Sequence, residues 1–153
     1  MDVTGDKVDG VLMWLLRMED RTLSGVVRDL GDRAGRTRYG INELWDSKLV
    51  PPDFFDKPPL DALEDAKAFY RKQFWDALNL DSVDMPFAAS ILSCAVNCGP
   101  GTAKELYRIT VDLPTFIAAW KAHYRQLAAN NPHDSQFLTG WLRRADAIYP
   151  DLP

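Results

Sequence analysis

The chain has 153 residues, of which 46% are hydrophobic and 11% aromatic, and its formal net charge is −4. This composition excludes an intrinsically disordered chain and suits a single domain over residues 1–153. The acidic balance argues against nucleic acid as a partner, and no apolar stretch is long enough for stable insertion into a membrane.

An amphipathic helix is predicted at the start of the chain. Apolar residues recur at helical spacing between Val8 and Met18, so this helix should end near Glu19. Residues 20–40 carry glycine and alanine breaks among charges, which predicts a loop with a few weak strands. Gly40 is expected to permit a backbone conformation that a side chain would forbid.

A short helix is expected to start at Ile41–Trp45, followed by an extended connector over Val50–Pro59, which contains four prolines. The clearest helical pattern of the chain is Leu60–Leu78. Asp61 is its predicted N-cap, and Glu64 stands three residues later, as in a capping box.

The rest of the chain is predicted to be helical. The helix opened by Pro86 runs to about Val96, and its sequence FAASILSCAV is apolar almost all round, which predicts a buried central helix. Trp75 and Trp141 are expected in the core. Further helices are expected from Thr102 as N-cap to Ile109, from Pro114 to Ala129, and from Ser135 to Tyr149. The predicted fold class is therefore mainly α, with one small irregular or β lobe near residues 20–40.

Two carboxylates flank this predicted lobe. Glu19 closes the first helix, and Asp32 lies with Thr37 on the loop that can fold back towards it. Glycosidic bond cleavage requires such a pair: one acid to protonate the leaving oxygen, and one anion to stabilise positive charge or position a water. Because the chain has 22 acidic residues, a pair at this spacing also arises easily by chance.

The sequence around the pair supports the catalytic interpretation. The string GDRAGRTRYGI (residues 31–41) is followed by AKAFYRKQFWDALN, ILSCAVNCGPGTAKELYR and QFLTGWLRRADAIY. In this order, over roughly residues 8–149, the strings resemble glycoside hydrolase family 108, the N-acetylmuramidases of phage endolysins and bacterial cell-wall enzymes. The resemblance implies a lysozyme-like helical domain with a small β lobe.

The chain departs from the family pattern close to the proposed acid. Asp20-Arg21-Thr22 replaces the Gly-Gly-Tyr that follows the catalytic Glu in the family, and the loop to Asp32 is longer. Asp29 falls within the lengthened loop and competes with Asp32 for the role of second carboxylate. Cys94 stands where the family often has Asp.

The resemblance implies hydrolysis of the β-1,4 bond between N-acetylmuramic acid and N-acetylglucosamine. Glu19 would be the general acid, kept protonated by burial beside apolar groups such as Trp14 or Leu15. Asp32 would stay ionised and either stabilise the oxocarbenium-like transition state or activate a water. Thr37 would help to place that water or the sugar.

Two further residues are candidate substrate contacts. Tyr39 either touches the sugar or packs the loop on the core. Asn97, at a helix end before Gly99, either touches the sugar or hydrogen-bonds the backbone.

Arginines are concentrated around the proposed site. A local positive field there would favour anionic peptidoglycan through its lactyl-peptide carboxylates, whereas the alternative is an ordinary solvated loop. The residues concerned are Arg17, Arg21, Arg28, Arg33, Arg36 and Arg38.

No cofactor and no metal are expected. Cys94 and Cys98 stand four positions apart near the predicted end of a helix, where disulfide geometry is rare, so they are predicted to be reduced thiols. Together with the distant His123 and His133 they match no zinc pattern.

Several settings remain open. With no signal-peptide pattern, the chain is expected to be made in the cytoplasm and delivered to the periplasm or cell wall by a phage holin or a secretion system. A secreted effector would have a cognate inhibitor protein as a second partner, beside the peptidoglycan glycan strand. The alternatives from other classes are an inactive cell-wall-binding protein and a helical protein-interaction module.

Overall fold

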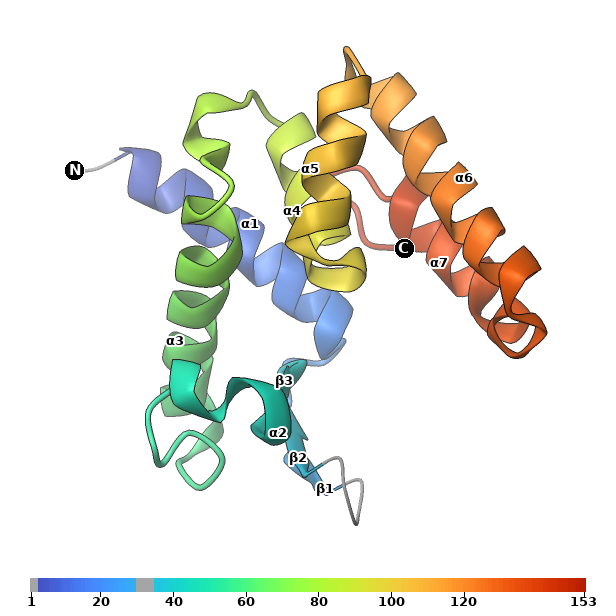
Figure 1. The fold of residues 1–153 in the computed structure, drawn as a ribbon. Coiled ribbons are helices and arrows are strands. Elements are labelled where there is room, and N and C mark those ends of the chain that lie inside the picture. The colour runs from blue at the N-terminus through green and yellow to red at the C-terminus, as the bar shows by residue number, and fades with distance from the viewer. Residues whose placement is uncertain (1–2, 30–34) are drawn as a thin grey trace. The chain divides into compact units, whose positions relative to one another are not determined.

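A computed structural model describes residues 3–29 and 35–153, and the chain forms two compact units, Met1–Gln73 and Phe74–Pro153 (Figure 1). Within the described ranges the protein is mainly α, with seven α-helices and one three-stranded antiparallel sheet. The predicted fold class is confirmed, and the architecture is consistent with a lysozyme-like fold. Of the helices in these ranges, none has both the length and the apolar character needed to cross a bilayer.

Two helices frame the N-terminal unit, α1 (Val3–Glu19) and α3 (Pro59–Tyr70). They pack against each other, and the Lys67 Nζ joins them by an ion pair to Asp9 at 2.9 Å. The face of α1 predicted from helical spacing is buried, with at most 3% of each side chain exposed, at Val8, Val11, Leu12, Leu15 and Leu16. The first helix of the sequence analysis is therefore confirmed, including its end at Glu19.

The sheet of the small lobe has the strand order β1 (Arg28–Asp29), β2 (Arg36–Arg38) and β3 (Ile41–Asn42). Both pairs are antiparallel. The two-residue turn between β2 and β3 has positive φ at Tyr39 (52°) and Gly40 (76°), the signs that a type I′ hairpin requires. The expectation that Gly40 adopts a conformation reserved for glycine is confirmed.

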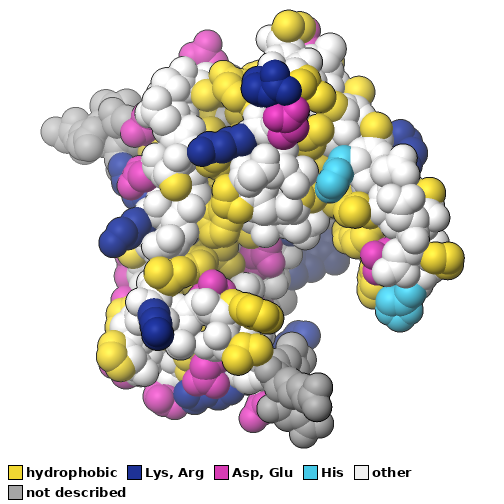
Figure 2. Space-filling model, viewed as in Figure 1, with side chains coloured by type: hydrophobic (Ala, Val, Ile, Leu, Met, Phe, Trp, Pro, Cys, Tyr) yellow, Lys and Arg dark blue, Asp and Glu magenta, His cyan; other side chains and the backbone are white. Residues whose placement is uncertain are grey.

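Helix α2 (Glu43–Asp46) follows β3 directly and leads into the 3-10 turn η1 (Ser47–Leu49). The Asn42 side chain caps α2 by accepting from the backbone N–H groups of its second and third residues. The expected helix start at Ile41 is wrong, because Ile41 pairs with Arg38 in the sheet. Figure 2 shows hydrophobic side chains at the surface of this part of the N-terminal unit; the exposed ones include Leu44, Trp45 and Leu49.

The connector that follows is not extended. Backbone hydrogen bonds from Phe54 to Pro51 and from Lys57 to Asp53 fold it into consecutive turns, which bury Phe54 and Phe55. The two aromatic rings supply the apolar area that holds these turns on the core.

Helix α3 begins at Pro59, with Pro58 in the N-cap position. The prediction of Asp61 as N-cap is wrong: Pro59, whose missing N–H needs no partner, opens the first turn, and the N-cap lies three residues earlier, at Pro58. After Tyr70 the helix widens into the π-helical segment η2 (Arg71–Asp76), a local change that often marks functional sites.

The C-terminal unit is built around α4 (Phe87–Cys98). Every residue from Ala88 to Ala95 is buried, so the predicted central helix is confirmed. It packs against α5 (Pro100–Ile109), α6 (Leu113–Asn130) and α7 (Leu138–Asp146), and the short segments η3 (Leu80–Ser82) and η4 (Pro132–Phe137) complete the unit.

Aromatic residues fill much of this second core. Trp75 is 2% exposed and donates its indole N–H to Asp81 Oδ1 at 2.8 Å, as a buried indole requires. Trp141 is half-buried and stacks on Tyr124 with ring centroids 5.1 Å apart. The core position predicted for Trp75 is confirmed, whereas Trp141 keeps part of its ring at the surface.

Helix starts in this unit differ from expectation. The last helix starts at Leu138 and ends at Asp146, because the predicted start Ser135 lies in the 3-10 segment η4, and α6 starts one residue before the predicted Pro114. Helix α5 starts at Pro100, after Gly99 with φ 95°, so Thr102 lies inside the helix and is not its cap. The true capping box belongs to α6, where Asp112 accepts from the Thr115 backbone N–H at 2.9 Å and Thr115 caps the Asp112 backbone in return.

Candidate active site

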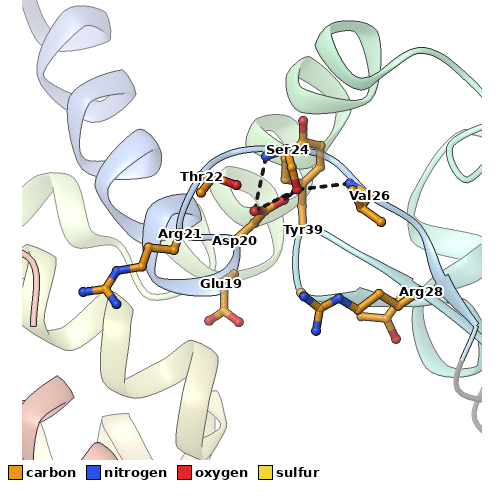
Figure 3. Close-up of a pocket in the computed structure, with 10 residues that line it drawn as sticks. Glu19, Asp20, Arg21, Thr22, Ser24, Val26, Arg28 and Tyr39 are labelled. Carbon is orange, nitrogen blue, oxygen red and sulfur yellow. Dashed lines mark hydrogen bonds between the residues drawn. The ribbon is translucent and has the colours of Figure 1, made fainter.

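A pocket of about 560 Å³ lies in the N-terminal unit at the C-terminal end of α1 (Figure 3). This volume is typical of a small-molecule or oligosaccharide site. Its lining comes from the loop after α1, from β1 and β2, and from the hairpin turn, and comprises Glu19, Asp20, Arg21, Thr22, Ser24, Val26, Arg28, Thr37, Tyr39 and Gly40.

Glu19, the predicted acid, is half-buried in this pocket wall. In Figure 3 its side chain points away from the loop of residues 20–24. A Cβ atom at position 40 would lie 2.8 Å from Glu19 Oε2 and 2.7 Å from the Tyr70 hydroxyl. Only glycine therefore lets the hairpin turn approach the carboxylate this closely.

The turn beside Glu19 is held in a strained conformation by hydrogen bonds. The buried Tyr70 hydroxyl donates to the Tyr39 carbonyl oxygen at 2.6 Å, and positive φ at a residue such as tyrosine is costly unless the surroundings enforce it. The Tyr39 side chain is 2% exposed and its hydroxyl donates to the Pro59 carbonyl oxygen at 2.9 Å. Burial raises the pKa of Tyr39. Tyr39 thus borders the pocket, but its side chain mainly packs the loop onto α3.

The loop after Glu19 is organised by its neighbour Asp20. The Asp20 carboxylate accepts hydrogen bonds from the Ser24 backbone and hydroxyl and from the Gly25 N–H, the last at 2.8 Å. Asp20 lines the pocket as well, but these bonds commit it to the loop. Of the two neighbouring carboxylates, Asp20 therefore organises the loop, whereas Glu19 lies in the pocket wall beside Gly40.

Thr37 lies at the centre of the sheet and lines the pocket. It pairs in register with Arg28 on β1 and with Asn42 on β3, and Asn42 donates its amide N–H to the Thr37 hydroxyl at 3.2 Å. Paired residues of an antiparallel sheet present their side chains on one face. Arg28 and Thr37 therefore share the face that borders the pocket.

Strand alternation puts the neighbouring arginines of β2 on the opposite face. Arg36 forms ion pairs with Glu43 and Asp56, both at 2.7 Å. Arg38 is 3% exposed and donates to the backbone carbonyl oxygens of Gly25, Phe54 and Lys57 at 2.6–2.9 Å. These two arginines therefore hold the lobe together, and neither lines the pocket.

The other predicted site residues are distributed as follows. Asp32 and Arg33 lie outside the described residues. Asp29 pairs with Arg36 in the sheet, so alternation turns it away from the pocket face on which Thr37 lies. Asn97 belongs to the C-terminal unit, at the end of α4, where its side-chain oxygen accepts from the Tyr124 hydroxyl at 2.5 Å.

In residues 3–29 and 35–153, no cluster of three or more His, Cys, Asp or Glu side chains is placed to hold a metal ion. Cys94 is buried and Cys98 half-buried, and both are free thiols.

Comparison with known families identifies the scaffold. Residues 13–99 match the family described as Glycosyl hydrolase 108. The chain belongs to this family. The resemblance seen in the sequence is thereby confirmed, and the glycosyl hydrolase 108 assignment places the protein among the glycoside hydrolases that act on peptidoglycan.

The match begins within α1, six residues before Glu19, and ends at Gly99 after α4. It therefore contains every residue that lines the pocket. The last string of the resemblance, QFLTGWLRRADAIY, lies beyond the matched residues of this glycosyl hydrolase 108 member. No curated protein and no solved structure matches the chain.

Two residues that hold the pocket wall in place were not predicted from the sequence: Asp20, which orders the loop, and Tyr70, which fixes the hairpin turn. Asp20 followed by Ser24-Gly25 is a pattern in which a carboxylate caps a turn, and it could have been found from the sequence. The role of Tyr70 could not have been found in this way, because Tyr70 lies 31 residues from its partner Tyr39 and only the packing of α3 brings them together.

Proposed function

We propose that this glycosyl hydrolase 108 member is an N-acetylmuramidase that cleaves the β-1,4 bond between N-acetylmuramic acid and N-acetylglucosamine, with Glu19 as the general acid. The observation that supports this most is the position of Glu19. It lines a pocket at the junction of helix and lobe, and the neighbouring Asp20 is committed to the loop.

In the proposed reaction, the Glu19 carboxyl group donates its proton to the bridging oxygen as the bond from this oxygen to the muramic acid C1 breaks. The glucosamine unit leaves with a new hydroxyl group, and positive charge develops at C1 and the ring oxygen. Water attacks C1 and gives its proton to a carboxylate of the site, so that the muramic acid becomes the new reducing end. If that carboxylate is Glu19 the acid is restored directly, and if it is the second carboxylate, proton exchange with solvent restores both groups.

We propose Asp32 as the second carboxylate, which stabilises this charge or activates the water, with Thr37 placing the water or the sugar. Support for Asp32 over Asp29 comes from strand alternation, since Asp29 lies on the sheet face opposite Thr37. Asp32→Asn should lower kcat by about tenfold or more, whereas Asp29→Asn should stay near wild type. The reverse ranking would transfer the role to Asp29.

The assignment of Tyr39 and Asn97 as sugar contacts can be tested in the same assay. Tyr39→Phe keeps the ring and removes the hydroxyl that bonds to Pro59, and Asn97→Ala removes the acceptor of Tyr124. A sugar contact predicts a raised KM with unchanged melting temperature. A structural role predicts a lowered melting temperature with little change in KM.

The central experiment is digestion of purified peptidoglycan followed by mass spectrometry of the reduced products. A muramidase leaves muramic acid at the reducing end, a glucosaminidase leaves glucosamine, and a lytic transglycosylase leaves an anhydro sugar. Either of the last two products would overturn the proposed bond specificity.

Glu19→Gln should lower the rate by about 100-fold or more, as expected for removal of a general acid. Glu64→Gln is the matched control, because it also removes one negative charge but lies on α3 with 70% of its side chain exposed. A folded Glu19→Gln protein with full activity would refute the assignment. Binding to peptidoglycan without release of products from the wild-type protein would instead favour an inactive cell-wall-binding protein.

We propose that the protein acts in the periplasm or cell wall, where its substrate lies, after release by a holin or a secretion system. Expression with an export signal should cause lysis, and expression without one should not. If lysis occurs, co-expression of neighbouring genes in the periplasm tests for a dedicated inhibitor, which would mark an effector and not an endolysin.

A further inference from the structure

We infer that Arg21 and Arg28 recognise a carboxylate of the substrate beside Glu19, and so make the enzyme selective for acidic glycans over neutral ones. This inference rests on the proposed function. It adds to it two specificity residues and the chemical group that they bind.

The first observation is the position of the two guanidinium groups. Arg21 comes from the loop after α1 and Arg28 from β1, and both line the pocket with exposed side chains. Figure 3 shows their side chains on either side of Glu19. Arg28 is fixed on the pocket face by its pairing with Thr37.

The second observation is the contrast with the arginines of β2. Arg36 is held by two carboxylates and Arg38 by three backbone carbonyl oxygens. Among the described residues, no ion pair or hydrogen bond engages the Arg21 or Arg28 side chain. The described part of the lobe therefore uses one pair of arginines to hold its fold, whereas the other pair lines the pocket and is not bound by a described side chain.

The third observation is the charge balance of the pocket. Its charged lining residues are Glu19, Asp20, Arg21 and Arg28. Glu19 is neutral when it acts as an acid, and the Asp20 carboxylate is partly compensated by the N–H groups of Ser24 and Gly25. Among these described lining residues, two arginines then face one compensated carboxylate. With the ionised Asp32 of the proposed mechanism added, the two guanidinium groups still match the carboxylates in number, so the site does not repel an anion although the chain as a whole is acidic.

The ligand group that fits is a carboxylate, which the planar guanidinium group binds through paired hydrogen bonds. On a peptidoglycan strand such a group comes from the stem peptide, or from the lactyl side chain of muramic acid after the stem has been removed. A chitin-type strand has the same β-1,4 glycan linkage but no carboxylate.

The test combines variants with substrates. Activity is measured on intact peptidoglycan, on glycan strands stripped of stem peptides by an amidase, and on peptidoglycan whose carboxylates have been converted to amides with a carbodiimide and an amine. For the wild type, amidation should raise KM by about threefold to tenfold, the effect of losing one or two charge-assisted hydrogen bonds at an exposed site. Loss of activity when intact peptidoglycan is amidated assigns a stem carboxylate, because the lactyl group of intact peptidoglycan is already an amide. Loss of activity when the stripped strands are themselves amidated assigns the lactyl carboxylate.

Arg21→Gln and Arg28→Gln should raise KM on intact peptidoglycan by a similar factor and should make the enzyme indifferent to amidation. The matched control is Arg17→Gln, which removes one positive charge from an exposed position of α1 that does not line the pocket. It should keep the full response to amidation. Added salt should weaken the binding of peptidoglycan by the wild type more than by the variant that carries both Arg21→Gln and Arg28→Gln.

Sedimentation of the Glu19→Gln protein with each type of peptidoglycan gives a second readout that needs no turnover. If Glu19→Gln is inactive while the arginine variants retain wild-type selectivity, the inference is wrong and the proposed function stands. If the wild type releases no products, yet binding still depends on carboxylates and on both arginines, the proposed function is wrong and the recognition of carboxylates stands.

Discussion

Gly40 lies against the Glu19 carboxylate so closely that a single methyl group at position 40 would fall 2.8 Å from Oε2. The two residues are brought together by the hairpin turn, which the Tyr70 hydroxyl fixes through the Tyr39 carbonyl oxygen. The position of the proposed acid therefore depends on an element that follows it by about twenty residues in the sequence.

Gly40→Ala should reduce both activity and stability. The new methyl group collides with Glu19 and with the Tyr70 hydroxyl, and φ of 76° is unfavourable for alanine. We expect loss of about 1–3 kcal/mol of unfolding free energy and a fall in kcat larger than the stability loss explains at the assay temperature. Urea denaturation and peptidoglycan turnover measure the two effects.

Gly140→Ala provides the control for that variant. Gly140 lies in α7 with open space around its missing Cβ, so alanine should leave activity unchanged and stabilise the helix by up to about 1 kcal/mol. A Gly40→Ala protein with wild-type kcat would show that the close contact does not position the Glu19 carboxylate.

Arg38→Gln should destabilise the N-terminal unit by about 3 kcal/mol. The arginine is buried and serves three carbonyl oxygens, from Gly25, Phe54 and Lys57, and unsatisfied buried acceptors cost about 1–3 kcal/mol. The exposed Arg17→Gln serves again as control, with a change within about 0.5 kcal/mol. Equal urea midpoints for the two variants would contradict the structural role of Arg38.

Acid should loosen the attachment of α2 to the sheet. The hydrogen bonds from Arg36 lower the pKa of Glu43, so the folded pKa lies below the unfolded one. The stabilisation is then fully present above the ordinary glutamate pKa of about 4.3 and is lost as the pH falls through the lower folded value. NMR shifts of residues 36–46, followed from pH 7 to pH 2, should report this loss.

Glu43→Gln should remove the same contribution already at pH 7 and should flatten the acid transition of residues 36–46. Glu105→Gln removes a carboxylate whose ion pair with Arg108 lies in the C-terminal unit, so it should leave the transition of residues 36–46 in place. A Glu43→Gln protein with the wild-type acid transition would assign it to other groups.

Cys98 should react with thiol reagents faster than Cys94. The neighbouring Cys94 thiol lowers the pKa of Cys98, whereas Cys98, together with burial, raises the pKa of Cys94. Because the thiolate is the nucleophile, alkylation by iodoacetamide should be confined to Cys98 near neutral pH. Its rate should rise with pH along a curve whose midpoint lies below the ordinary value of about 8.5.

Cys94→Ala removes the neighbouring thiol and should move the midpoint of Cys98 alkylation upward. Cys98→Ser should abolish the rapid labelling altogether. Mass spectrometry of labelled peptides distinguishes the two thiols, and equal labelling of Cys94 and Cys98 would contradict the prediction.

Local patterns were sufficient for much of the helical framework. The apolar spacing of α1 and the uniformly apolar sequence of α4 each predict burial, because a helix must cover whatever apolar face it has. The starts of α3 and α5 were predicted incorrectly, since a proline in the first turn competes with the nearby Asp61 and Thr102 as the start signal.

The family could be inferred from the order of short strings along the chain, and the mainly α fold class and the candidate acid Glu19 from residue type and spacing within single elements. Which charges near Glu19 face the pocket could be known only from the folded protein. Arg28 and Arg38 are the same residue type in one small lobe, but strand pairing turns the first towards the pocket, and packing surrounds the second with carbonyl oxygens. Such a difference arises from contacts between segments distant in the chain, which no local pattern records.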